Sequence, residues 1–219
     1  GVYTHNPIIM FNVKSKILKK DNDMTELDEE VSKLIYDYEM QLKSDSVIKK
    51  DIERIYISSV EEFHVNERNG NEIRCLLIRL PYKSLDSFRN IRNGFVGHLE
   101  RKLNCFVFVV AVRKILSKRV KTPGVKIRPR SRTLTHVYDC LLEDITLPSS
   151  IVGKQIRVHT DGTQTTKIFL DPLDQGKVED RLDAMSEAYR RVTSKKVKFF
   201  FAKPTKFQSL VLKRAQEKK

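Results

Sequence analysis

A run of arginines carries the clearest chemical signal in the sequence. Residues 128–135 read Arg-Pro-Arg-Ser-Arg-Thr-Leu-Thr and include no acidic residue. Pro129 disfavours helix at the residue before it and holds its own backbone close to an extended conformation. In an extended segment alternate side chains share one face about 6.6 Å apart, close to the spacing of successive phosphates along a nucleic-acid strand. We therefore expect the guanidinium groups of Arg128, Arg130 and Arg132 to bind phosphate oxygens side by side.

A helix predicted directly after these arginines offers a second anion site. Thr133 or Thr135 can cap its first turn, where backbone N–H groups have no partner within the helix. The alternative is a basic stretch whose threonine simply caps a helix. Because three close arginines without a neighbouring acid repel one another until an anion binds, the pattern favours phosphate binding.

The arginines belong to a longer segment of a single sign of charge. Residues 113–132 hold nine basic residues and no acidic one. Such a segment is either a solvated loop or a phosphate-binding surface, and its high density of positive charge favours a phosphate-binding surface. The residues of this region that we predict to contact phosphate groups are Arg113, Lys114, Lys118, Arg119, Lys121, Lys126, Arg128, Arg130, Arg132 and Thr133.

Other residue patterns do not form a convincing catalytic or metal site. His136, Asp139 and Glu143 fall on nearby turns of one predicted helix, but no set of nucleophile, base and orienting residue accompanies them. The three cysteines are far apart and lack the spacing of a zinc site. The aromatic residues 199–201 suit core packing better than base stacking. We therefore expect no enzyme activity, no cofactor and no metal.

Composition narrows the partners further. The 219 residues carry a net charge of +14, while residues 21–72 alone hold 15 acidic and 6 basic residues, so the remainder is strongly positive. A positive surface favours nucleic acid or an acidic membrane as the partner. The longest apolar run falls well short of the roughly 20 residues of a membrane span, and residues 1–10 do not resemble a signal peptide. These features predict a protein of the cytosol or nucleus.

Periodicity supplies the elements that must position the basic residues. Apolar residues at helical spacing predict helices over residues 25–42, 84–103, 134–142 and 178–192. Alternating or continuous apolar runs predict strands at 55–60 and 73–80, a central strand at 106–112, a hairpin over 156–170 and a last strand at 197–201. Thr25 and Asp28 have the spacing of a capping box, and Asp161-Gly162 suits a hairpin turn.

These elements predict an α+β fold with mixed, mostly antiparallel sheets flanked by about four helices. Each half of the chain shows the order helix, strand, strand, helix, strand, which suggests a pseudo-repeat. We expect one domain over residues 24–201 that includes the basic loop, preceded by an extension at 1–23 and followed by a basic tail at 202–219.

The chain resembles the eukaryotic small-subunit ribosomal protein S7e family. Besides the arginine run, the matching residues are Leu142-Glu143-Asp144, Pro148-Ser149, Ile151-Val152-Gly153-Lys154, Ile156-Arg157-Val158 and Asp161-Gly162, with Pro81, Leu85, Ser87-Phe88, Ile91, Val96, Leu99-Glu100, Lys102, Arg113 and Ile115-Leu116 upstream. The resemblance covers roughly residues 24–201. It does not extend to residues 1–23 or to the tail after 203.

The resemblance implies a non-enzymatic component of the small ribosomal subunit. Such a protein binds small-subunit rRNA, contacts neighbouring ribosomal proteins and assembly factors, and takes part in subunit assembly and rRNA processing in the nucleolus before it works in the cytoplasm. It is not an obligate homo-oligomer. On this basis Lys154 and Arg157 of the hairpin join the predicted RNA-contacting residues, and the acidic first helix is expected to face solvent or a basic neighbouring protein.

Two other classes of function use the same basic surface. One is a nucleic-acid-processing enzyme outside the ribosome, which needs a carboxylate or metal constellation near the loop. The other is a chromatin or DNA-binding factor, which would differ from a ribosomal protein by preferring duplex DNA to structured RNA.

Overall fold

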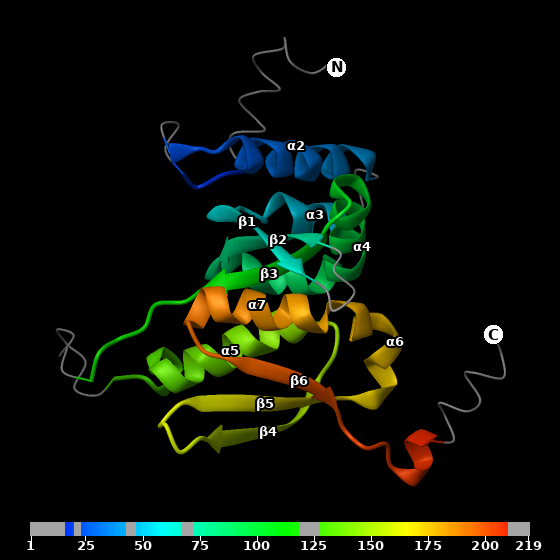
Figure 1. Cartoon of the computed structure of the whole chain (residues 1–219). Coiled ribbons are helices and arrows are strands. Elements are labelled where there is room, and N and C mark those ends of the chain that lie inside the picture. Colours follow the sequence, from blue (N-terminus) through cyan, green and yellow to red (C-terminus); the bar gives the residue numbers. More distant parts are fainter. Residues whose placement is uncertain (1–15, 20–22, 43–46, 67–71, 119–127, 210–219) are drawn as a thin grey trace. The chain divides into compact units, whose positions relative to one another are not determined.

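A computed structural model of the protein describes residues 16–19, 23–42, 47–66, 72–118 and 128–209 (Figure 1). The chain divides into two compact units, residues 1–133 and residues 134–219. Each unit has its own three-stranded sheet and its own helices. The two units are described in turn.

The first unit contains helices α2 (Glu26–Gln41), α3 (Val47–Glu53) and α4 (Leu85–Leu103) with strands β1 (Ser59–Asn66), β2 (Glu72–Pro81) and β3 (Phe106–Val112). Strand β2 lies in the middle of the sheet, antiparallel to β1 and parallel to β3. Residues 75–78 form a continuous apolar run that is buried on both faces, as is expected of a central strand. One apolar cluster joins the three helices to the sheet.

Helix α2 begins where the capping-box spacing predicts. The side chain of Thr25 accepts a hydrogen bond from the backbone N–H of Asp28, and the Asp28 carboxylate accepts one from the backbone N–H of Thr25. Asp28 also accepts a hydrogen bond from the N–H of Val60 in β1 and pairs with Lys19. A residue that caps the helix therefore also ties it to the sheet.

Helix α4 carries two glycines that the helix tolerates for different reasons. A Cβ atom at Gly94 would lie 2.9 Å from the Tyr38 hydroxyl oxygen of α2, so the missing side chain permits a close approach of the two helices. At Gly97 a Cβ atom would meet nothing within 4 Å. The helix ends at Asn104, whose left-handed backbone (φ 48°) stops helical hydrogen bonding.

The second unit repeats the order of the first. It contains α5 (Leu134–Thr146), β4 (Ile151–Val158), β5 (Gln164–Leu170), the short α6 (Gln175–Val178), α7 (Leu182–Thr193) and β6 (Val197–Phe201). Strand β5 lies in the middle, antiparallel to β4 and parallel to β6. Between β4 and β5 the chain turns at Gly162 (φ +79°), while Asp161 accepts hydrogen bonds from the N–H and hydroxyl of Thr163.

The α+β class and the pseudo-repeat are therefore confirmed. In both units an antiparallel hairpin is followed by a crossover helix and a third strand parallel to the second, because parallel neighbours need a crossover connection. The strands at 106–112 and 197–201 lie where the sequence predicts them. Among the described helices, none has the length and apolar character needed to cross a membrane.

Three predictions about the elements were wrong, and one helix was missed. The first strand begins at Ser59 rather than at residue 55, because residues 55–58 link α3 to the sheet and bury two isoleucines, and Ile57 forms an isolated bridge with Ile17 instead of extending β1. Strand β3 is at an edge of its sheet rather than in the centre. Helix α7 begins at Leu182, after two short turns. Helix α3 was not predicted, because its seven polar-rich residues show little periodicity.

Candidate nucleic-acid interface

The basic segment begins where strand β3 ends. Arg113 is half-buried, with its guanidinium carbon 5.9 Å from the centre of the Tyr82 ring and Nη1 donating to the Ala111 carbonyl oxygen. Lys114 and Lys118 are exposed. The guanidinium group of Arg113 is therefore already engaged in contacts within the protein, whereas the two lysines after it are exposed to solvent.

The two described ends of the basic segment are joined at Leu116. The backbone N–H of Leu116 donates to the carbonyl oxygen of Arg132 over 3.0 Å. Arg128 donates from Nη1 to the carbonyl oxygen of Leu116 over 2.7 Å. These two bonds hold residues 113–118 against residues 128–133, so the exposed basic side chains on both stems belong to one local surface.

The predicted extended arrangement of the three arginines was wrong. Arg130–Arg132 form a single 3-10 turn, closed by hydrogen bonds from the Arg132 N–H to the Pro129 carbonyl and from the Thr133 N–H to the Arg130 carbonyl. Each residue of such a turn rotates by about 120°, so its first and third side chains diverge. Proline restricts its own backbone and the residue before it, which leaves the following residues free to turn.

The three arginines therefore have different roles in the structure. Arg128 is half-buried and serves as a clamp on Leu116, whereas Arg130 and Arg132 are exposed. In the described part of the chain, no carboxylate lies within ion-pair distance of Arg130 or Arg132. The hydroxyl of Thr133 donates to the Arg130 carbonyl oxygen at 2.7 Å, so this residue supports the turn. Three further predicted residues, Arg119, Lys121 and Lys126, lie outside the described residues.

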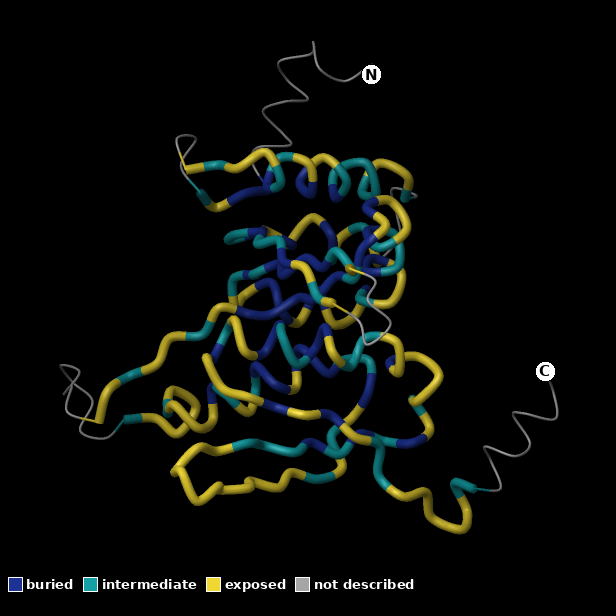
Figure 2. Tube along the Cα trace, viewed as in Figure 1, coloured by how far each residue is buried: buried dark blue, intermediate teal, exposed yellow. Residues whose placement is uncertain are grey.

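The two hairpin candidates lie on opposite faces of β4. Lys154 pairs with Asp139 of α5 at 2.5 Å, whereas Arg157 is exposed three residues later on the other face. The structure does not bring them together into one site. Strand β4 is exposed along most of its length, as Figure 2 shows.

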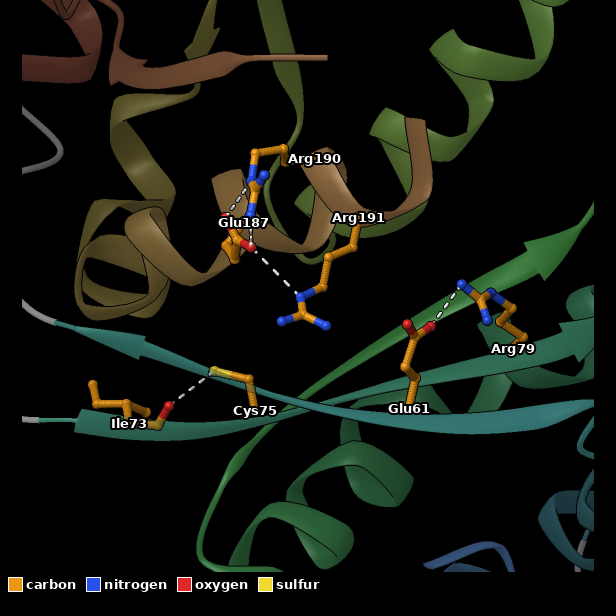
Figure 3. A network of polar contacts seen from close by, with 7 residues as sticks. All are labelled: Glu61, Ile73, Cys75, Arg79, Glu187, Arg190 and Arg191. Atoms are coloured by element: carbon orange, nitrogen blue, oxygen red, sulfur yellow. Dashed lines mark hydrogen bonds and ion pairs between the residues drawn. The ribbon is translucent and has the colours of Figure 1, made fainter. Parts of the chain in front are cut away.

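Several arginines elsewhere are already paired with acids of their own unit. In the first unit, Arg79 of β2 lies 2.7 Å from Glu61 of β1. In the second, Glu187 of α7 pairs with both Arg190 and Arg191 (Figure 3). Hydrogen bonding to Arg190 lowers the pKa of the Glu187 carboxyl, so this acid stays ionised beside its partners. Such paired arginines are less available to a polyanion than Arg130 and Arg132.

The residues considered for catalysis do not converge on one point. His136 lies 3.5 Å from the Cys140 sulfur on the exposed side of α5, but Asp139 is paired with Lys154. Within the described residues no group of three metal-binding side chains occurs. Burial raises the pKa of the Cys75 thiol to about 12 and that of Cys105 to about 11, which keeps both thiols protonated at neutral pH.

Residues 199–201 were predicted to pack in the core rather than to stack on bases, and for Phe200 this prediction was wrong. Phe199 is buried, in agreement with the core packing predicted for it, but Phe200 on the other face of β6 is 40% exposed. Its ring lies beside that of Phe169 in β5, with centroids 6.1 Å apart. The alternation along β6 contains this signal, but only the strand pairing reveals that Phe169 joins it.

Comparison with known proteins gives consistent matches. A family model described as ribosomal protein S7e matches residues 15–201. Small ribosomal subunit protein eS7 of Avicennia marina is 38% identical over 194 residues, covering 88% of this chain and 98% of the relative. Protein eS7z of Arabidopsis thaliana is 34% identical (88% and 97% covered), and eS7 of Drosophila melanogaster is 32% identical (86% and 95% covered).

Proposed function

The chain belongs to the ribosomal protein S7e family, and we propose that, as a structural protein of the small ribosomal subunit, it binds small-subunit rRNA. Its relatives are named as small ribosomal subunit proteins, and the chain spans nearly their whole length. A ribosomal protein meets RNA mainly through phosphates and the shape of RNA helices, which suits a surface of lysines and arginines.

The observation that carries the proposal is the exposed pair Arg130 and Arg132 on a turn that is held in place. The hydrogen bonds at Leu116 fix the turn, and the two guanidinium groups lack a carboxylate partner among the described residues. Because the turn is already ordered, it loses little conformational freedom when RNA binds, and this lowers the entropic cost of binding. Lys114 and Lys118 on the opposite stem extend it, and we propose that Arg119, Lys121 and Lys126 also contact RNA.

The divergent arginines suit structured RNA better than a single strand. Side chains that point in different directions from one turn can reach phosphates on two RNA strands or on two sides of a groove. Recognition then depends on the placement of phosphates rather than on base edges. Binding through released counterions falls as salt is raised, with a slope set by the number of phosphates contacted.

The remaining parts of the proposal concern partners and place in the cell. We propose that the protein takes part in assembly of the small subunit and in rRNA processing, with a nucleolar stage before the mature ribosome enters the cytoplasm. The exposed acids of α2, among them Glu26 and Glu30, face away from RNA toward solvent or a basic neighbouring protein. Residues 24–201 serve as one ribosome-binding domain without obligate self-association.

Charge reversal tests the proposal directly. The double variant Arg130→Glu and Arg132→Glu is expected to leave small subunits during a raised-salt wash that wild-type protein survives, measured by co-sedimentation. The matched control reverses Lys177 and Arg190, two exposed bases that pair with acids of the second unit. If the Arg130/Arg132 variant stays bound in stoichiometric amount while its fold is intact, the proposed role of this surface is wrong.

A further inference from the structure

The sheet of the second unit has two faces of different character. Residues in register share a face, so Ile168 with Phe199 and Leu170 with Phe201 mark the face that contributes to the core. The opposite face, here called the open face, consists of Gly153, Gln155, Arg157, Thr165, Lys167, Phe169, Lys198 and Phe200. These residues are exposed or half-buried, whereas Lys154 on the opposite face of β4 pairs with Asp139 of α5.

Two aromatic rings form one row of the open face. Phe169 and Phe200 are register partners, with ring centroids 6.1 Å apart and planes inclined at 34°. On the other side, Phe169 pairs with Gly153. A Cβ atom at Gly153 would lie 3.7 Å from the Cδ2 atom of Phe169, in ordinary contact with the ring. The glycine therefore leaves this flank of the aromatic row uncovered.

Two lysines form the next row. Lys167 and Lys198 are register partners on adjacent strands, about 6.6 Å along the strands from the aromatic row. Like charges directly opposite one another destabilise a sheet, so this pair costs stability in the free protein. Lys167 also lies with Nζ 5.6 Å from the centre of the Phe200 ring. In the described residues, no carboxylate pairs with Lys167, Lys198 or the exposed Arg157.

We infer that the open face binds unpaired RNA nucleotides, whose bases stack on Phe169 and Phe200 while their phosphates lie beside Lys167, Lys198 and Arg157. Every base offers a flat face, so stacking tolerates any sequence. Phosphates next to the stacked bases remove the repulsion between the two lysines. Lysine is depleted at the centres of protein–protein interfaces, whereas aromatic rings beside lysines without acids are typical of single-strand binding.

This surface differs in kind from the basic turn at Arg130 and Arg132. It rests on the proposed function only in taking the RNA to be that of the small subunit. The turn presents charge without aromatic rings and suits paired RNA, whereas the open face combines both and suits nucleotides outside helices. The two surfaces can therefore be tested with different probes.

The first test measures binding of a fluorescent 12-nucleotide oligouridylate to the full-length protein by anisotropy at fixed salt. Phe200→Leu keeps an apolar side chain but removes the aromatic face, and we expect binding to weaken about 5- to 30-fold. Ile156→Ser is the matched control, because Ile156 is 61% exposed and lies on the other face of the same sheet. Equal affinity of wild type and Phe200→Leu would overturn the inference.

Two further variants separate binding from folding. Gly153→Leu covers the flank of Phe169, and Lys198→Glu replaces a like-charged pair with an attractive one. Both are expected to raise the unfolding midpoint in urea, because each adds a favourable cross-strand contact, and both are expected to weaken oligouridylate binding at least about fivefold. Binding that is retained by both of these stabilised variants contradicts the inference.

A third test identifies the partner in assembled small subunits. Phe200 is replaced by the photoreactive p-benzoylphenylalanine, and the adducts formed on irradiation are mapped. Crosslinks to rRNA support the inference, whereas crosslinks to ribosomal proteins alone overturn it in favour of a protein interface. The proposed function is tested separately, by whether the double variant Arg130→Glu and Arg132→Glu still co-sediments with small subunits. Subunits that retain the protein but show no rRNA crosslink at Phe200 leave that function standing and reject the stacking surface.

Discussion

The carboxylate of Asp28 accepts a hydrogen bond from the backbone N–H of Val60 over 2.8 Å, although the two residues lie 32 positions apart in the sequence. The same carboxylate closes the capping box of α2 and pairs with Lys19, and it is fully buried. One carboxylate thus accepts hydrogen bonds from a backbone N–H at the start of a helix, from a backbone N–H of the sheet and from an ammonium group.

Substitution of Asp28 is expected to destabilise the first unit strongly. Asp28→Ala leaves the N–H of Val60 and the ammonium of Lys19 without their acceptor, which should cost about 3 kcal/mol in the free energy of unfolding. Glu30→Ala on the exposed side of the same helix should change it by less than about 0.5 kcal/mol. Urea titration followed by circular dichroism measures both. Equal midpoints for the two variants would contradict this account of Asp28.

The same carboxylate makes stability depend on pH. Burial raises the pKa of Asp28 and is the largest single effect, but hydrogen bonds from Lys19, Thr25 and Val60 together outweigh it and lower the pKa below its ordinary value of 3.8. The unfolded chain therefore binds the proton first. The stabilisation is present above about pH 4 and is lost as pH falls through the lower, folded-state pKa. In urea titrations between pH 2 and 6, Asp28→Asn should show a shallower acid loss than wild type, and parallel curves would refute this.

Arg128 is expected to act on the structure of the loop stems rather than on RNA alone. Arg128→Ala removes the hydrogen bond to the Leu116 carbonyl, so the amide of Leu116 should exchange its hydrogen about tenfold faster. Arg130→Ala, on the exposed side of the turn, should leave this exchange rate unchanged. Amide exchange followed by nuclear magnetic resonance distinguishes the two. A similar acceleration in both variants would show that Arg128 is no clamp.

The glycines of α4 should respond in opposite ways to alanine. Gly97→Ala adds a methyl group in open space and should stabilise the helix by about 0.5–1 kcal/mol. Gly94→Ala places a methyl group against the Tyr38 hydroxyl, and the Tyr38 ring is held in place by its packing on Phe95 and His98. This variant should therefore gain no stability, or lose some. In a double-mutant cycle Tyr38→Phe should restore the benefit at position 94. Additive effects would exclude the steric explanation.

The three cysteines should differ sharply in reactivity. At pH 8 about one Cys75 side chain in 10⁴ is a thiolate, given its pKa of about 12, and Cys105 is also buried. Cys140 is partly exposed on α5. We expect Ellman's reagent to modify one thiol rapidly in the native protein and all three in urea. Cys140→Ser should abolish the rapid reaction, and a second rapid thiol would contradict the buried environment of the other two.

Local patterns predicted the elements well where one residue type and one period dominate. The capping box of α2, the continuous run of β3 and the hairpin turn at Gly162 depend on residues close together in the sequence. The arrangement of the arginines did not follow from the sequence, because the turn is held by a hydrogen bond from Leu116 on the opposite stem and by the Thr133 hydroxyl, which donates to the Arg130 carbonyl oxygen. The open face was missed because Phe169 and Phe200 are brought together only by a parallel strand pair.

The parallel third strand in each unit also determines the order in which the protein can be completed during its own synthesis. The first sheet has all its strands once residue 112 has been made, whereas the second waits for β6, which ends at Phe201. At about 5–20 residues per second, several seconds of translation separate these two points. From the completion of β5 at Leu170 until the completion of β6 at Phe201, β4 and β5 exist as a hairpin without the strand that completes them. The apolar residues Ile168 and Leu170 on its inner face stay exposed to other nascent chains and to chaperones until the last strand arrives.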